Sequence, residues 1–226
     1  MSNPSFFPAP DRCTLCPRRC MARRAQGQAG FCGAAGVLKA ARAALHFWEE
    51  PCISGQRGSG TVFFSGCTLK CCYCQNYPIS AEVQGKELSV DRLAAIFLEL
   101  QQKGAHNINL VTPGQWRPWI TAALDKARAE GLTLPIVCNT GSYETLESIA
   151  AWQGYVDIWL ADLKYVSPAV SAELSAAPDY FAVAKAAIEA MMAQTGRPVL
   201  DAEGILRRGV ILRHLALPGH TEDSFA

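Results

Sequence analysis

Three cysteines in one short stretch have the spacing of a metal-binding loop. Cys67, Cys71 and Cys74 follow one another as Cys-x3-Cys-x2-Cys. Three thiolates so close in sequence converge only if they wrap a compact object, and a cubane iron–sulfur cluster fits because Cys thiolate is its usual ligand. A cubane normally takes four cysteines, so three would leave one iron open to a ligand from outside the protein. The spacing by itself indicates a three-thiolate metal loop.

Other uses of these residues stay open at this stage. Zinc could be bound with Cys72 as a fourth ligand, although adjacent Cys71 and Cys72 fit poorly around one tetrahedron. The thiols could also be paired in disulfides or buried without a metal. Tyr73 could belong to the site or be an ordinary core aromatic residue.

A predicted strand leads into the loop. Residues 61–65 (Thr-Val-Phe-Phe-Ser) are rich in β-branched and aromatic types and are followed by Gly66, which is typical of a short strand. The cysteines therefore leave the carboxyl end of a strand. This is where α/β barrels and open parallel sheets place their chemistry.

A second group of four cysteines lies nearer the N-terminus: Cys13, Cys16, Cys20 and Cys32. Four thiolates suffice for a closed structural zinc site or for a cubane without an open iron. The spacing predicts a second metal site and does not decide between zinc and iron–sulfur. Reduced cysteines without a metal remain the alternative.

Composition restricts the class of protein. The 226 residues are 50% hydrophobic and 18% charged, enough for a sizeable core and unlike a disordered chain. The ten cysteines are clustered in metal-type spacings, which indicates a reducing compartment. The first residues lack a signal-peptide pattern and no apolar run is long enough for a membrane span. We therefore expect a cytoplasmic protein without a membrane partner.

Charge is concentrated at the N-terminus. Residues 1–42 carry a net charge of +6, and the remainder carries −5. A basic face could bind an anionic partner, offset the charge of a thiolate-bound centre, or simply be solvated. We do not expect nucleic acid as the partner.

From residue 61 onward, predicted strands alternate with predicted helices. Strands are expected over 61–65, 106–112, 134–138, 156–161 and 209–215, and helices over 89–104, over 118–130, after a cap at Ser142, and over 179–196. Residues 34–48 could form either a strand or a helix. This alternation favours an α/β fold with a parallel sheet and right-handed crossovers.

The cysteine loop resembles the motif of the radical S-adenosylmethionine (SAM) superfamily. The matching residues are Cys67, Cys71 and Cys74, with Tyr73 at the aromatic position. The resemblance implies that the open iron of a [4Fe-4S] cluster chelates SAM, that one electron cleaves SAM to methionine and a 5′-deoxyadenosyl radical, and that Tyr73 packs near the adenine.

A fuller resemblance, spanning nearly the whole chain, is to uncharacterised iron–sulfur radical SAM proteins related to the pyruvate formate-lyase activating enzyme. It rests on the cysteine loop together with Cys13 to Cys20, residues 41–51, Thr112-Pro113-Gly114, residues 139–144, Asp162-Leu-Lys164 and residues 213–219. It implies a partial (β/α)6 barrel over residues 56–226 and a Cys-rich extension over 1–55. The expected barrel lacks its last unit, so we suspect a truncated chain with an exposed strand edge.

The expected SAM contacts lie at strand carboxyl ends. Asn139, Thr140, Asp162, Lys164 and Arg213 occupy such positions, and Arg213 resembles the arginine of the corresponding strand in activating enzymes. An ion pair near a strand end is the alternative for Asp162, Lys164 and Arg213.

One segment departs from the family pattern. Where activating enzymes usually have Gly-Gly-Glu, this chain has Thr112-Pro113-Gly114-Gln115. Without a carboxylate there, backbone carbonyls of Thr112, Pro113 and Gly114 would have to accept the hydrogen bonds of the SAM amino group.

The expected function is an iron-dependent oxidoreductase that generates a radical from SAM for hydrogen abstraction. By resemblance, its substrate could be a glycine of a partner protein, and its reductant a flavodoxin or ferredoxin. The alternative is a truncated, non-catalytic iron–sulfur or metal-binding protein whose basic segment binds a partner.

Overall fold

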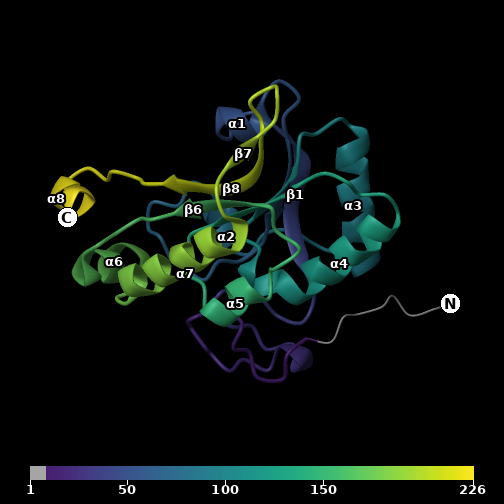
Figure 1. Ribbon diagram of the computed structural model, residues 1–226. Coiled ribbons are helices and arrows are strands. Elements are labelled where there is room, and N and C mark those ends of the chain that lie inside the picture. The colour runs from purple at the N-terminus through teal and green to yellow at the C-terminus, as the bar shows by residue number, and fades with distance from the viewer. Residues whose placement is uncertain (1–8) are drawn as a thin grey trace.

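The computed structural model describes residues 9–226, which form one mixed sheet of eight strands with helices around it (Figure 1). The strands lie in the order β3-β1-β2-β4-β5-β6-β8-β7. Their bounds are β1 Lys39–His46, β2 Ser59–Phe64, β3 Lys86–Glu87, β4 Ile108–Val111, β5 Ile136–Thr140, β6 Ile158–Asp162, β7 Val199–Leu200 and β8 Leu206–Arg213.

The predicted parallel strands are confirmed with shifted ends. β2, β4, β5, β6 and β8 pair in parallel in that order, and they are the five expected strands. Residues 39–46, left open between strand and helix, form β1, which pairs antiparallel with β2. The short strands β3 and β7 pair antiparallel with β1 and β8 and carried no signal in the sequence. The fold is thus α/β with a mostly parallel sheet.

Helices cover one face of the sheet, except for a short one after β1 that packs on the opposite face. The longer ones are α3 Val90–Gln102, α4 Arg117–Ala129, α6 Pro168–Ser175 and α7 Tyr180–Thr195. The shorter ones are η1 Arg24–Gln26, α1 Pro51–Ser54, α2 Tyr77–Ser80, η2 Gly114–Trp116, α5 Leu146–Ala150 and α8 Thr221–Phe225. The apolar faces of α3, α4 and α7 join alternate strand residues such as Leu110 and Trp159 in the main core.

The opposite face of the sheet is apolar at one end and polar at the other. Ile53 of α1 packs against Val137 and Ile158 near the beginnings of β5 and β6. Because side chains alternate along a strand, the same face carries Asn139 and Asp162 further on. The polar side chains of this face are therefore concentrated at the carboxyl ends of the strands.

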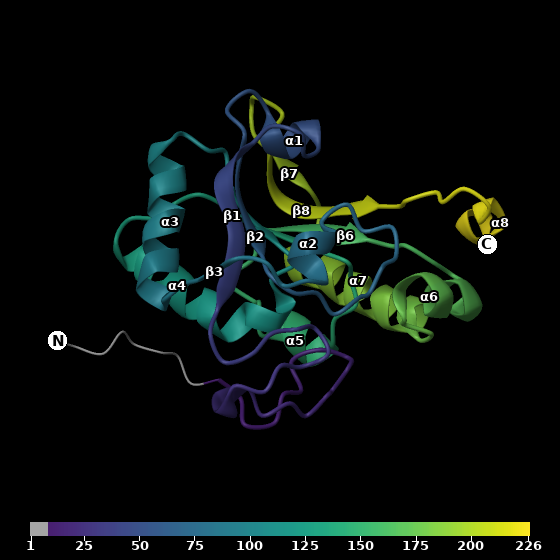
Figure 2. The same ribbon diagram turned by 180° about the vertical axis from the view of Figure 1, so that it is seen from behind.

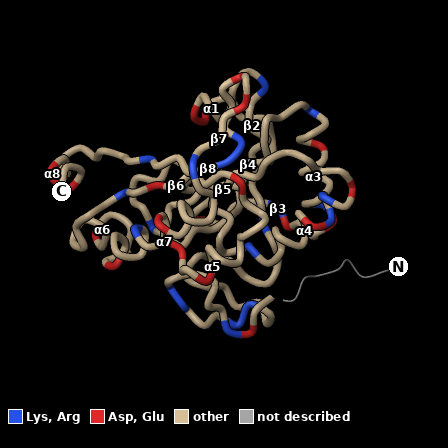
Figure 3. Tube along the Cα trace, viewed as in Figure 1, with Lys and Arg blue, Asp and Glu red and all other residues tan. Residues whose placement is uncertain are grey.

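The part of the Cys-rich extension that precedes β1, residues 9–38, lies at the end of the molecule opposite to α1, as both Figure 1 and Figure 2 show. It crosses the end of the sheet near α5. Several of its Lys and Arg residues are visible at the bottom of Figure 3, in agreement with the net charge of +6 over residues 1–42.

One predicted helix start was wrong. The sequence indicated Ser142 as the cap of α5, but Thr145 is the N-cap and its hydroxyl accepts a hydrogen bond from the backbone N–H of Ser148. Ser142 instead has a positive φ of 59° in the turn after β5, so the helix cannot start there.

Replacing the two hydroxyl residues separately tests this cap. Thr145→Ala should lower the free energy of unfolding by about 1 kcal/mol, because it removes the cap hydrogen bond. Ser142→Ala should change it by less than about 0.5 kcal/mol, because the buried Ser142 hydroxyl has no hydrogen-bond partner within residues 9–226. Urea unfolding of both variants measures the difference, and an equal loss in both would contradict the assignment.

Candidate functional site

The three cysteines of the Cys67–Cys74 loop each have a hydrogen-bond partner at sulfur. The backbone N–H of Leu69 donates to Cys67 Sγ over 3.4 Å, and Ser175 Oγ donates to Cys71 Sγ over 2.8 Å. Ser80 Oγ lies 3.2 Å from Cys74 Sγ. Hydrogen bonds to sulfur are one means by which proteins tune iron–sulfur clusters. By donor set, the loop fits a thiolate-bound cluster.

The thiols of Cys67, Cys71 and Cys74 lie near one another. Burial raises the pKa of Cys67 to about 12, and repulsion from the thiolates of Cys71 and Cys74 contributes in the same direction, so the three groups are near neighbours. Cys72 is exposed. In residues 9–226, no group of three or more His, Cys, Asp or Glu side chains is placed to hold a single metal ion.

Gln115 holds the beginning of the loop in place and was missed as a functional residue. Its side-chain amide donates to the carbonyls of Ser65, Gly66 and Thr112 over 3.2, 2.9 and 2.9 Å. The indole of Trp116 donates to the Ser65 carbonyl over 2.8 Å. The residue that replaces the expected glutamate is therefore directed into the protein, where it ties the end of β4 to the end of β2.

The remainder of this segment has contacts of its own. The Thr112 carbonyl already accepts one hydrogen bond from Gln115. Gly114 is buried, and a Cβ at this position would lie 2.5 Å from Glu144 Oε1. The structure thus brings Gly114 to Glu144. No hydrogen bond links Pro113 or Gly114 to a described residue of the cysteine loop.

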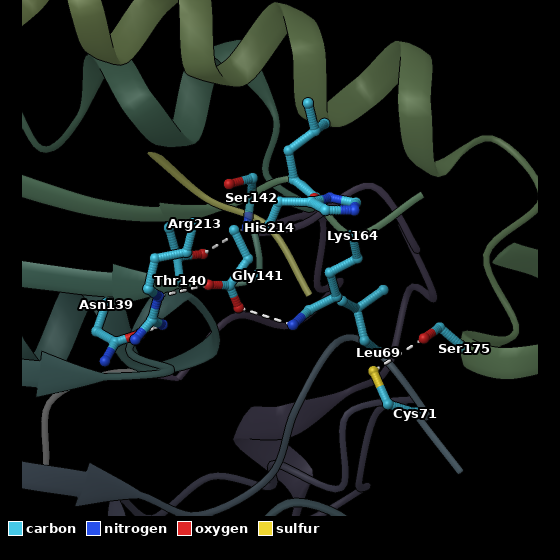
Figure 4. A network of polar contacts seen from close by, with 12 residues as sticks. Leu69, Cys71, Asn139, Thr140, Gly141, Ser142, Lys164, Ser175, Arg213 and His214 are labelled. Carbon is cyan, nitrogen blue, oxygen red and sulfur yellow. Dashed lines mark hydrogen bonds and ion pairs between the residues drawn. The ribbon is translucent and has the colours of Figure 1, made fainter. Parts of the chain in front are cut away.

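Asn139, Asp162, Lys164 and Arg213 do meet in one network, as the close-up in Figure 4 shows for three of them. Lys164 Nζ lies 2.7 Å from Asp162 Oδ2. Arg213 donates from Nε to Asp162 Oδ1 and from Nη2 to Asn139 Oδ1, each over 2.8 Å. These contacts lie at the ends of the neighbouring strands β5, β6 and β8. The sequence predicted that the residues would lie at strand ends, with ion pairing as the alternative role, and the structure shows both.

Two acidic residues of the network were not predicted. Glu49 and Glu50 follow β1, and their carboxylates lie 3.6 and 3.5 Å from Arg213 Nη1. Burial raises the pKa of Glu49, while the charge of Arg213 opposes this. Glu50 Oε2 is buried and lacks a hydrogen-bond partner among the described residues. No local sequence signal predicted that these two carboxylates would lie beside Arg213 and Asn139.

Lys164 links the network to the cysteine loop. Asp162 is the main cause that raises the pKa of Lys164 against the opposing effect of burial, and the Cys71 thiolate adds to it. The side chain of Leu69 approaches Gly141, beside Lys164. The ammonium group is paired with Asp162, and the Lys164 side chain meets Gly141 next to Leu69 of the loop.

Tyr73 lies in an aromatic cluster beside the loop. Its hydroxyl hydrogen-bonds to that of Tyr165, which lies 2.6 Å from Ser175 Oγ, the donor to Cys71. Tyr165 also packs edge-to-face on Tyr180, with ring centroids 5.4 Å apart. Tyr73 is thus connected to Cys71 through two hydroxyl groups, and it also packs as a partly buried aromatic residue against this cluster.

Thr140 was expected near SAM, but its side chain points to the other face of the sheet. Its hydroxyl donates to Glu144 Oε1 over 3.1 Å, and Ser148 Oγ donates to Glu144 Oε2 over 3.3 Å. Successive residues of a strand alternate between faces, so Thr140 cannot share the network of Asn139. Burial raises the pKa of Glu144 to about 7, although both hydrogen bonds and Arg117 lower it.

The second cysteine group is assembled by turns of the extension. Cys13, Cys16 and Cys32 are buried and Cys20 is exposed. The backbone of Cys13 pairs with Ala22 and Met21 over 3.1 and 3.0 Å, which returns the chain to Cys13 after Cys20. Burial raises the pKa of Cys32, and the Cys13 and Cys20 thiolates add to the increase.

No family model matches the chain. Among curated proteins, it is 28% identical over 217 residues to the uncharacterized protein MJ0674 of Methanocaldococcus jannaschii. The match covers 93% of this chain and 58% of that protein, so the chain spans less than two thirds of the relative's length. Because the relative is uncharacterized, the similarity brings no activity with it. Within residues 9–226, no helix has both the length and the apolar character to cross a membrane.

Replacing Gln115 tests its role at the start of the loop. Gln115→Glu should lower the free energy of unfolding by about 3 kcal/mol or more at neutral pH, because a buried carboxylate would face three carbonyl oxygens. Gln115→Ala should cost less, since it loses the hydrogen bonds without adding a charge. Urea unfolding measures both, and a Gln115→Glu protein as stable as the unmodified chain would contradict this geometry.

The pH dependence of stability tests Glu144. Its pKa is about 7 in the folded protein, and the usual value for Glu in an unfolded chain is about 4.3. Between these values the folded state keeps a proton that the unfolded state has released. The contribution is therefore complete below the unfolded pKa and is lost as pH rises through the folded pKa, a total of about 4 kcal/mol.

The measurement is urea unfolding between about pH 4.5 and 8. Glu144→Gln should remove the decrease in stability with rising pH that this group causes. Glu173→Gln, which changes an exposed residue of α6, is the matched control and should keep it. The same pH slope in Glu144→Gln and the unmodified chain would contradict the assignment.

Proposed function

We propose that this protein is a radical SAM enzyme that binds a [4Fe-4S] cluster through Cys67, Cys71 and Cys74. The observation that carries the proposal is the meeting of the three-cysteine loop, at the end of β2, with the polar network at the ends of β5, β6 and β8. The parallel strand order and the hydrogen bonds to all three sulfurs support it. The closure of the sheet into a partial barrel belongs to this proposal.

The charges of the network suit SAM. Glu49, Glu50 and Asp162 provide three carboxylates against the two cations Lys164 and Arg213. SAM carries a sulfonium, an ammonium and a carboxylate, and so has one excess positive charge. A network with one excess negative charge complements it.

The residues of the chain have distinct tasks in this proposal. Arg213 and Lys164 would donate to the carboxylate and hydroxyl groups of SAM, and Asp162 holds both cations in place. Asn139 and Glu49 can accept from ribose hydroxyls and the ammonium group. Gln115 fixes the turn from which the cysteines start. When bound, the cluster and SAM supply one-electron cleavage to a 5′-deoxyadenosyl radical.

The family resemblance also suggests a class of substrate and a class of electron donor. A glycine of a partner protein would be the substrate if the family resemblance extends to activity. A flavodoxin or ferredoxin would supply the electron.

Anaerobic reconstitution tests the proposed function. With iron, sulfide, dithionite and SAM, the unmodified chain should release 5′-deoxyadenosine. Cys71→Ala should reduce the release at least about 100-fold, because the cluster would lose one of its three thiolates. Cys72→Ala alters an exposed neighbour and should retain activity. Iron binding without any SAM cleavage would sink the proposal and favour a non-catalytic iron–sulfur protein.

A further inference from the structure

Two sulfurs of the second cysteine group lie against Gly30. A Cβ on Gly30 would lie 3.0 Å from Cys20 Sγ and 3.8 Å from Cys32 Sγ. Cys13 joins them through Ala22, whose Cβ lies 3.6 Å from the same Cβ position and whose carbonyl accepts a hydrogen bond from the Cys13 N–H over 3.1 Å. Cys16, three residues after Cys13, is buried like Cys13 and Cys32. Turns of the extension thus bring this cysteine group to Gly30, a position where only a residue without a side chain leaves room.

A buried cation stands beside these thiols. Arg24 is fully buried, and its Nη1 lies 3.9 Å from Cys13 Sγ. Its Nε and Nη1 donate to the carbonyls of Ala35 and Gln115, and its guanidinium lies over the rings of Trp116 and Trp119 at 4.7 and 4.8 Å. Its Nη2 is buried with no hydrogen-bond partner among the described residues.

An unpaired buried cation is costly unless a negative charge compensates it. Neutral thiols would not provide this charge. Four thiolates around a divalent zinc ion, or around an iron–sulfur cubane, would leave a net negative centre next to Arg24. The buried guanidinium is therefore independent of the cysteine spacing and points to the same ligand.

The second cysteine group also contacts the first. The backbone N–H of Cys67 donates to the Cys32 carbonyl over 3.2 Å, and a Cβ on Gly66, at φ 85°, would lie 2.4 Å from that oxygen. Arg18 Nε donates to the Thr68 carbonyl over 2.9 Å. The extension thus fixes the backbone at the very residues where the cluster loop begins.

We propose that Cys13, Cys16, Cys20 and Cys32 bind a second, four-thiolate metal centre, with Arg24 as its buried counter-cation, and that this centre holds the Gly66–Cys67 turn in place. The ligand is zinc or an iron–sulfur cluster, which share this thiolate chemistry. The proposal does not depend on SAM cleavage, because the four cysteines and Arg24 lie outside the Cys67–Cys74 loop.

The test uses the full chain with Cys67, Cys71 and Cys74 all changed to Ala, so that the first site is absent. Purified anaerobically and reconstituted, it should retain either about one zinc or about four irons with sulfide per chain. A further Cys16→Ser change should reduce this content at least about tenfold, whereas Cys72→Ser should not. Metal content below about a tenth per chain, or unchanged by Cys16→Ser, would overturn the proposal.

Two milder variants keep the test valid if Cys16→Ser fails to fold. Gly30→Ala inserts a methyl group against the Cys20 and Cys32 sulfurs, and Arg24→Gln removes the charge. Each should speed loss of the metal to a chelator at least about tenfold, with the fold checked by circular dichroism. Loss at the unmodified rate in both variants would contradict the assigned ligands and counter-cation.

Hydrogen exchange tests the link to the cluster loop. The backbone N–H of residue 67 is retained in the Cys67→Ala chain, so its bond to the Cys32 carbonyl should remain. Removing the metal with a chelator should speed exchange in the peptide containing residue 67 at least about tenfold, and leave α3 unchanged. Equal exchange with and without metal would refute the coupling while leaving SAM cleavage to be judged separately.

Discussion

The side-chain amide of Gln115 is the interaction on which the candidate site depends. Its N–H groups hold three carbonyls, two at the start of the cysteine loop and one at the end of β4. Free carbonyls buried at this point would be costly. By satisfying them, Gln115 fixes the direction in which the chain leaves β2, and with it the position of Cys67. A carboxylate could not replace it, because a carboxylate has no donor.

The region around Gln115 also joins the sheet to the Cys-rich extension. The side chain of Gln115 donates a hydrogen bond to the cysteine loop, and its backbone carbonyl accepts one from Arg24 of the extension. The Cys32 carbonyl accepts from Cys67 in turn. The loop is thus fixed from both the sheet and the extension, which explains why so small a set of residues can position three thiols without regular secondary structure.

The polar network follows a different physical rule. On the face of the sheet opposite the helices, apolar side chains near α1 give way to Asn139, Asp162 and Arg213 at the carboxyl ends. Charges are tolerated there because each is paired: Arg213 contacts three acidic residues, and Lys164 contacts Asp162. Such a preorganised set of donors and acceptors costs little to arrange when a zwitterionic ligand enters.

Sequence alone determined the parallel strands, the main helices and the cysteine loop at a strand end, because periodicity and turn residues are local signals. It also placed Asn139, Asp162, Lys164 and Arg213 at strand ends. Tertiary structure decided what local signals cannot carry. Strand alternation turned Thr140 away toward Glu144, and positive φ removed Ser142 as a cap. Gln115 contacts a loop residue 49 positions away in the sequence, and Glu50 contacts Arg213 across 163 positions. Such contacts form only when distant segments pack together, which is when burial and charge pairing are set.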